Sequence, residues 1–170
     1  SGAALFVFGV MCLSAVSLFA QQKNSEKTLK DAYKDAFLVG VAVTPGITSA
    51  TDKASQDIVI KHFNSITVEN VMKAALINPQ PGVYNWAPAD DYVSFGEKNK
   101  MFIIGHTLVW HNQVPAWFFT SAEGKPNTKE EQIERLRSHI QAVAGRYAGR
   151  VNAWDVVNEV MGEDGNYRTT

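Results

Sequence analysis

The sequence predicts an α/β fold in which four strands lie parallel in one sheet. Apolar runs with strand character occur at 38–43, 66–68, 101–105 and 151–157. Segments with helical periodicity separate them, and successive strands lie roughly 28 to 50 residues apart, which is the spacing of βα units. Of the 170 residues, 45% are hydrophobic, which is ample for a packed core.

Helices are expected before and between these strands. Apolar residues at helical spacing predict helices at 25–37, at about 52–63 and at about 89–98, with Pro88 in the first turn of the third. His62 lies on the apolar side of the second helix, so we expect it to pack there without binding a ligand.

The helix before the fourth strand has a defined start and end. Thr128, with Glu131 three residues later, forms a capping-box pattern, and Gly149 marks the end. His139 is expected to be exposed on this helix. Its apolar stripe consists of Ile133, Leu136, Ile140, Val143, Ala144 and Tyr147.

Residues 1–20 are expected to be a signal peptide. Residues 3–20 form an almost uncharged apolar run, and Ala20 is a small residue at the cleavage position, although Leu18 is larger than usual two places earlier. A retained membrane anchor is the alternative interpretation. In either case the rest of the chain is exported, so the protein is expected to be secreted or periplasmic. The net charge of −1 gives no basis for binding nucleic acid or an anionic membrane.

Polar clusters follow three of the strands. They comprise Glu69, Asn70 and Lys73 after the second strand, His106, Trp110 and Gln113 after the third, and Asn158 and Glu159 after the fourth. Because parallel strands end at one edge of a sheet, these side chains should line a single cleft. Amides, carboxylates and imidazoles suit sugar hydroxyls, and an indole suits the apolar face of a sugar ring. The pattern therefore predicts a carbohydrate site.

No metal or cofactor is expected in this cleft. His106 and His111 are five residues apart with no clustered third ligand, and Cys12 is the single cysteine. Trp117 and Trp154 are assigned to packing. A simpler interpretation leaves Glu159 as a solvated carboxylate at a strand end, but the repetition of polar clusters at three strand ends favours a site.

Three sequence blocks at these strand ends carry a family resemblance. They are Glu69-Asn70-x-Met72-Lys73, the block from Gly105-His106-Thr107 to Pro115-x-Trp117, and Trp154-Asp155-Val156-Val157-Asn158-Glu159. They resemble the strand-two, strand-three and strand-four signatures of glycoside hydrolase family 10, and the resemblance extends from about Leu29 to Met161. It implies a retaining endo-β-1,4-xylanase on a TIM-type (β/α)8 barrel, of which this chain supplies about the first four strands.

The resemblance also implies a role for each residue of the three clusters. Glu159 would be the general acid/base, and Asn158 would bind the 2-hydroxyl of the sugar beside the scissile bond. Glu69, Asn70 and Lys73 would make polar contacts in the glycone subsites, and His106, Trp110 and Gln113 would line the cleft around the cleaved sugar.

The family's nucleophile lies at the end of a later strand, so residues 21–170 are expected to be the N-terminal half of a catalytic domain. This segment is shorter than the roughly 200 residues of the smallest (β/α)8 barrels, and four strands do not close a barrel. The fragment alone is expected to be inactive, and the full-length enzyme to be a monomer acting on xylan. Two alternatives stay open: a retaining barrel glycosidase acting on β-glucan, and a non-catalytic carbohydrate-binding barrel.

Overall fold

The structure is a computed structural model that describes residues 27–168. The expected signal peptide at 1–20 and Cys12 lie outside the described residues. Within 27–168, no helix is long and apolar enough to cross a bilayer.

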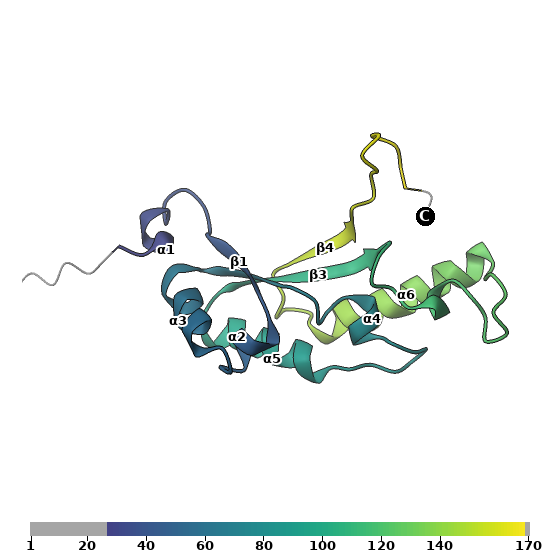
Figure 1. Cartoon of the computed structure of the whole chain (residues 1–170), viewed down its shortest axis with the longest axis horizontal. Helices are drawn as coiled ribbons and strands as arrows, with labels where there is room; N and C mark the ends of the chain where they lie inside the picture. The colour runs from purple at the N-terminus through teal and green to yellow at the C-terminus, as the bar shows by residue number, and fades with distance from the viewer. Residues whose placement is uncertain (1–26, 169–170) are drawn as a thin grey trace, which may run out of the picture.

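Four strands form one parallel sheet, in the order in which they occur along the chain. They are β1 (Gly40–Val43), β2 (Ser65–Val68), β3 (Phe102–Trp110) and β4 (Ala153–Asn158). Figure 1 shows them crossing the middle of the molecule. The parallel sheet predicted from the strand spacing is confirmed.

Most of the helical segments pack on one side of this sheet. The helical segments are α1 (Leu29–Ala32), α2 (Pro45–Thr48), α3 (Lys53–His62), α4 (Ala74–Ile77), α5 (Ala87–Lys98), the 3-10 helix η1 (Ala116–Phe118) and α6 (Lys129–Arg146). The three longest, α3, α5 and α6, lie on the same side of the strands (Figure 1). The predicted second and third helices are confirmed as α3 and α5, with Pro88 in the first turn of α5. His62 is half-buried, and its Nδ1 accepts a hydrogen bond from the backbone N–H of Leu29 at 3.3 Å.

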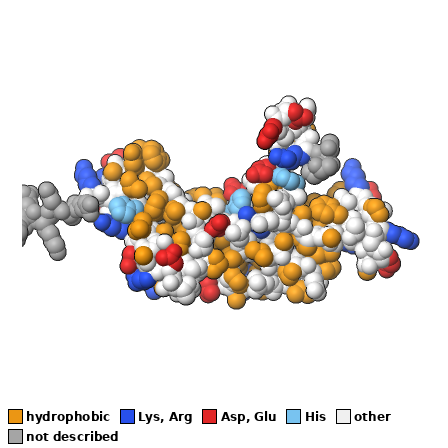
Figure 2. Space-filling model, in the orientation of Figure 1, with side chains coloured by type: hydrophobic (Ala, Val, Ile, Leu, Met, Phe, Trp, Pro, Cys, Tyr) orange, Lys and Arg blue, Asp and Glu red, His pale blue; other side chains and the backbone are white. Residues whose placement is uncertain are grey.

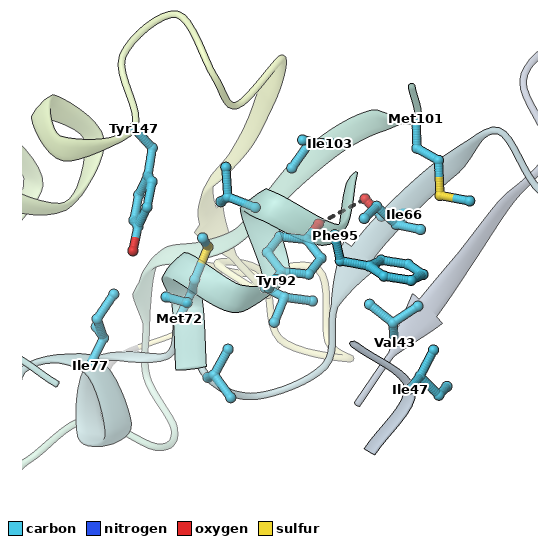
Figure 3. Packing of buried hydrophobic residues seen from close by; sticks show 14 of the residues in the cluster. Val43, Ile47, Ile66, Met72, Ile77, Tyr92, Phe95, Met101, Ile103 and Tyr147 are labelled. Carbon is cyan, nitrogen blue, oxygen red and sulfur yellow. Dashed lines mark hydrogen bonds between the residues drawn. The ribbon is translucent and has the colours of Figure 1, made fainter. Parts of the chain in front are cut away.

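The core lies between the sheet and these helices. Ile66 on β2, Ile103 on β3 and Tyr92 on α5 are at most 1% exposed. The Tyr92 hydroxyl donates to the backbone oxygen of Ile66 at 2.9 Å, as Figure 3 shows, and lies 2.8 Å from that of Ile104. Gly96 lets α5 approach β3, because a Cβ there would lie 2.6 Å from Ile103 Cγ1. This packing fixes β2 and β3, whose ends carry the polar clusters.

The helix predicted at 25–37 is wrong in extent, because residues 27–37, the described part of that range, contain only the four-residue α1. Thr28 caps its start by accepting from the backbone N–H of Asp31 at 3.3 Å. The apolar side chains that suggested a longer helix stay exposed: Leu29 is 43% exposed, Tyr33 45% and Phe37 59%. A helix of this length is marginal unless its apolar face is buried, so the segment turns after Ala32.

Strand β3 is longer than predicted. The sequence suggested an end at Gly105, but the strand continues to Trp110, so His106 and Trp110 lie within it. It stays paired with β4 across a register shift between His106 and Val109. Buried Thr107 lies at this shift, and its Oγ1 donates to the backbone oxygen of Asp155 at 2.8 Å. The polar residues His106 and Thr107 interrupt the apolar sequence pattern, so the pattern predicts an earlier end. The pairing with β4 nevertheless continues the strand to Trp110.

The predicted capping box at the start of α6 is confirmed. The Glu131 backbone N–H donates to Thr128 Oγ1 at 3.2 Å, and the Thr128 N–H donates to Glu131 Oε2 at 2.7 Å. The expectation that His139 is exposed is wrong, because its exposed fraction is 0%. His139 lies three residues after Leu136 and four before Val143, so it shares their inward face. Ile133, which was assigned to that stripe, is instead 44% exposed.

Candidate active site

Lys73 connects the end of β2 with the end of β3. Its Nζ donates to Asn70 Oδ1 at 2.9 Å and lies 4.8 Å from the centre of the Trp110 ring. Asn70 and Lys73 follow β2, and Trp110 is the last residue of β3. Side chains from two strands therefore converge, as expected at one edge of a parallel sheet. Together they offer hydrogen-bonding groups beside an apolar ring surface.

Glu159 lies directly after β4 and is held by an indole. Trp110 Nε1 donates to Glu159 Oε2 at 3.0 Å, and His111 Nε2 lies 3.9 Å from the same oxygen. The backbone φ of Glu159 is +50°, in the left-handed region that residues with a side chain rarely adopt. The side chain is 51% exposed, so the carboxylate is fixed on one side and open to a ligand on the other.

His106 is oriented by a carboxylate on the neighbouring strand. Its Nδ1 lies 2.9 Å from Asp155 Oδ2, and the two residues face each other in the β3–β4 register. The imidazole ring centre lies 6.4 Å from that of Trp110. A carboxylate on Nδ1 sets the orientation of the imidazole and leaves Nε2 as the other hydrogen-bonding atom.

The remaining predicted residues are placed at the same edge through their backbone. Asn158 lies opposite Trp110 in the β3–β4 register. Glu69 follows the last residue of β2, and its backbone N–H donates to the Val43 oxygen at 3.1 Å. The backbone oxygen of Gln113 accepts from the N–H of Ala75 at 2.8 Å. Seven of the eight predicted residues thus lie at or just beyond the ends of β2, β3 and β4, and His106 lies within β3.

Three further residues contact this group, and the strand-end pattern missed their contributions. Asp155 lies inside an apolar strand, and its pairing with His106 depends on the β3–β4 register. Its position four residues before Glu159 is a sequence signal that could have indicated a place in the site. His111 lies in the block after the third strand, but the sequence assigned it no role there beyond weighing it against a metal site. Arg168 lies outside every motif, and its Nε donates to the backbone oxygen of Glu159 at 2.9 Å.

A pocket of about 610 Å³ lies beside Glu159. Trp110, Asn158 and Glu159 line it together with apolar side chains such as Phe118 of η1 and Leu136 of α6. Ala74 of α4 also lines it, but the predicted residues after β2, Glu69, Asn70 and Lys73, do not. The pocket therefore extends from Glu159 toward the helix layer. It does not cover the whole candidate site, which is defined instead by the side-chain contacts at the strand ends. Within residues 27–168, no group of three or more His, Cys, Asp or Glu side chains is arranged to hold a metal ion.

Comparison with known proteins decides the family. Residues 28–170 match the family model described as glycosyl hydrolase family 10. The chain belongs to glycosyl hydrolase family 10. Its four-stranded parallel sheet is therefore part of a TIM-type barrel, which confirms the predicted fold class.

Relatives of this family 10 chain carry xylanase names. Endo-1,4-beta-xylanase A of Xylanibacter ruminicola is 40% identical over 163 residues, which cover 96% of this chain and 43% of that protein. A beta-1,4-xylanase of Dictyoglomus thermophilum is 45% identical over 139 residues, covering 82% and 37%. The solved structure of a GH10 endoxylanase retrieved from a sugarcane soil metagenome superposes with a TM-score of 0.80 at 43% identity. That match covers 84% of this chain and 41% of the other. The family 10 chain thus spans less than half the length of each.

Proposed function

We propose that this chain is the first half of the catalytic domain of a retaining endo-β-1,4-xylanase, in which Glu159 is the general acid/base. The observation that carries the proposal is the Glu159 carboxylate at the end of β4, hydrogen-bonded to Trp110 Nε1 at 3.0 Å and half exposed. An acid/base group must be fixed within reach of the scissile oxygen, and it must be open to substrate. Glu159 meets both conditions.

The surrounding residues supply the contacts that a polysaccharide requires. Lys73 lies over the Trp110 ring and bonds to Asn70, and the His106 ring centre lies 6.4 Å from that of Trp110. Sugar hydroxyls bind such polar groups, and the ring face packs on aromatic surface. We propose that Glu69, Asn70 and Lys73 bind the glycone sugars. Asn158 would contact the 2-hydroxyl beside the scissile bond, and Gln113 would line the cleft.

A retaining mechanism needs a second carboxylate about 5–5.5 Å from the first. One carboxyl group protonates the leaving oxygen, and the other forms and then releases a glycosyl-enzyme intermediate. Because the chain spans 37–43% of the relatives compared above, we propose that the nucleophile belongs to a later part of a longer polypeptide, called the full-length protein below. We also propose that this protein is exported by residues 1–20 and acts as a monomer.

Two other functions use the same residues differently. A barrel glycosidase acting on β-glucan would share Asn158 and Glu159, whereas the names of the relatives favour xylan. A non-catalytic carbohydrate-binding barrel would retain Trp110 and Lys73 but would not depend on the protonation of Glu159.

Kinetics of the full-length protein test this proposal. Glu159→Gln keeps the size of the side chain and removes the ionisable proton, so we expect kcat on xylan to fall about a hundredfold or more. Glu130→Gln, on the exposed first turn of α6, is the matched control and should leave kcat unchanged. Proton NMR of the first product should show the β-anomer.

Each alternative has its own outcome. Faster turnover of a β-glucan than of xylan would favour the glucanase. Xylan binding without turnover would favour the binding barrel. Full activity of Glu159→Gln, or an initial α-anomer, would contradict the proposed mechanism.

A further inference from the structure

We propose that Arg168 is a positioning residue for Glu159, and that it fixes the backbone conformation from which the carboxylate reaches the cleaved bond. The proposal rests on the function proposed above for Glu159. Arg168 lies nine residues after Glu159 and outside the three blocks that carry the family resemblance.

The backbone of Glu159 needs a constraint. Its φ of +50° lies in the left-handed region, which is unfavourable for a residue with a Cβ and persists only where the surroundings impose it. At this residue the chain leaves the β4 strand, so the conformation decides where the side chain projects. A relaxed, extended Glu159 would continue the strand and move the carboxylate away from Trp110.

Arg168 supplies such a constraint. Its Nε donates to the backbone oxygen of Glu159 at 2.9 Å, while Trp110 Nε1 donates to the carboxylate at 3.0 Å. Glu159 is thus held at both ends, by one donor on its carbonyl and another on its side chain. A change in either bond shifts the other, because a single residue connects them.

The segment between the two residues brings Arg168 back to β4. Met161 and Tyr167 form an antiparallel bridge, and the Gly162 N–H donates to the Asn166 oxygen at 2.7 Å. The Arg168 N–H donates to the Val160 oxygen at 2.9 Å. Figure 1 shows this turn standing beyond the end of β4 and returning toward it. The hairpin therefore delivers the Arg168 side chain to Glu159.

The hydrogen bond to the Glu159 backbone oxygen uses only Nε of Arg168. Substitutions can therefore separate the effect of this hydrogen bond from the effect of the positive charge. Arg168→Gln places an amide nitrogen at the position of Nε, attached to Cδ in the same way, without the charge. Arg168→Met places a methyl group at the same position and donates nothing. We expect Arg168→Gln to retain the effect and Arg168→Met to lose it.

The test is steady-state kinetics of the full-length protein on two xylobiosides. One carries a leaving group that departs only when protonated, and the other carries an activated aryl group that departs without help. For Arg168→Met we expect kcat on the first to fall about tenfold, the size of effect that loss of one hydrogen bond can produce. For the activated substrate, kcat/KM reports only the first step, which needs no acid there, so it should stay within about twofold even if the base role of Glu159 in the second step is weakened. Arg137→Met on α6 removes an exposed arginine that pairs with Glu134 and should change neither.

A spectroscopic readout accompanies the kinetics. The indole N–H resonance of Trp110, assigned with Trp110→Phe, should shift in Arg168→Met and stay in place in Arg168→Gln. If Arg168→Met does not fold, Arg168→Gln decides alone: kcat near wild type on the demanding substrate supports the proposal, and a tenfold loss overturns it.

Other outcomes are equally decisive. Equal losses on both substrates, or an unmoved Trp110 resonance in folded Arg168→Met, would overturn the positioning role. Absence of turnover in the wild-type protein would instead reject the proposed function, and the resonance would still report whether Arg168 positions Glu159.

Discussion

At the scale of single residues, Gly105 sets the packing beneath the site. It lies opposite Trp154 in the β3–β4 register, one residue before His106, and the Trp154 indole covers its Cα. A Cβ at Gly105 would lie 2.2 Å from Trp154 Cε3 and 2.3 Å from Cζ3. Trp154 directly precedes Asp155, the partner of His106, so the packed Gly105–Trp154 pair lies next to that pair in the β3–β4 ladder.

Gly105→Ala is therefore expected to destabilise the protein. The added methyl forces the indole to shift in a packed environment, which costs about 1–3 kcal/mol. The thermal midpoint of the full-length protein should fall by several degrees. Gly145→Ala is the matched control, because nothing lies within 4 Å of its added Cβ on α6 and alanine favours a helix. Equal midpoints for Gly105→Ala and the wild type would contradict the packing argument.

At the scale of elements, a buried histidine ties α6 to the segment after α4. His139 Nδ1 lies 3.2 Å from the side-chain amide of Asn78, which is 1% exposed. With the amide oxygen toward His139, the Asn78 nitrogen donates to the backbone oxygens of Gln80 and Val83 at 2.8 and 3.0 Å. Burial lowers the pKa of His139 to about 4, so the imidazole is neutral in the folded protein.

This burial makes stability depend on pH. In the unfolded chain His139 is protonated as pH falls below about 6.5, whereas in the folded protein it stays neutral until about pH 4. The stability that the neutral, buried His139 contributes is therefore complete above pH 6.5 and is lost as pH falls toward 4. Between pH 7 and 4.5 the loss should be about 2–3 kcal/mol. Urea unfolding of the full-length protein at both pH values measures it. His139→Asn should weaken this dependence, and Gln141→Asn, exposed on the same helix, should not. Identical pH dependence in wild type and His139→Asn would contradict the argument.

The elements that the sequence predicted well are those whose pattern and packing agree. Helix α6 has a capping box and an apolar face, and that face is buried. The segment predicted at 25–37 has the same spacing, but its large apolar side chains are exposed, and within residues 27–37 only α1 forms. His139 was misplaced because residue type suggested exposure, whereas its position on the helix determined burial.

The site was predictable wherever strand ends alone determine it. Glu69, Lys73 and Glu159 follow parallel strands, so their convergence could be inferred from order along the chain. Asp155 and Arg168 could not be found in this way. The first depends on the β3–β4 register, and the second on a hairpin that returns to Glu159.

At the scale of the whole molecule, the described sheet has two free edges. Strand β1 pairs only with β2, and β4 only with β3, among residues 27–168. Apolar side chains are exposed near both edges: Leu38 is 52% exposed, Val156 54% and Val157 51%. Figure 2 shows hydrophobic side chains gathered over α1 and the start of β1. A closed barrel has no such edges, since each strand there has two neighbours.

The 170-residue chain expressed alone should therefore associate and fail to hydrolyse xylan. Unpaired strand edges with apolar side chains template pairing with other chains, and the second carboxylate is proposed above to belong to a later part of the full-length protein. Size-exclusion chromatography should show species larger than the 18.7 kDa monomer. Val157→Lys places a charge on the exposed β4 edge and should reduce association, whereas Glu130→Lys on α6 should not. A monodisperse monomer that turns over xylan would show that four strands suffice, and would require a nucleophile among the acidic residues of this chain.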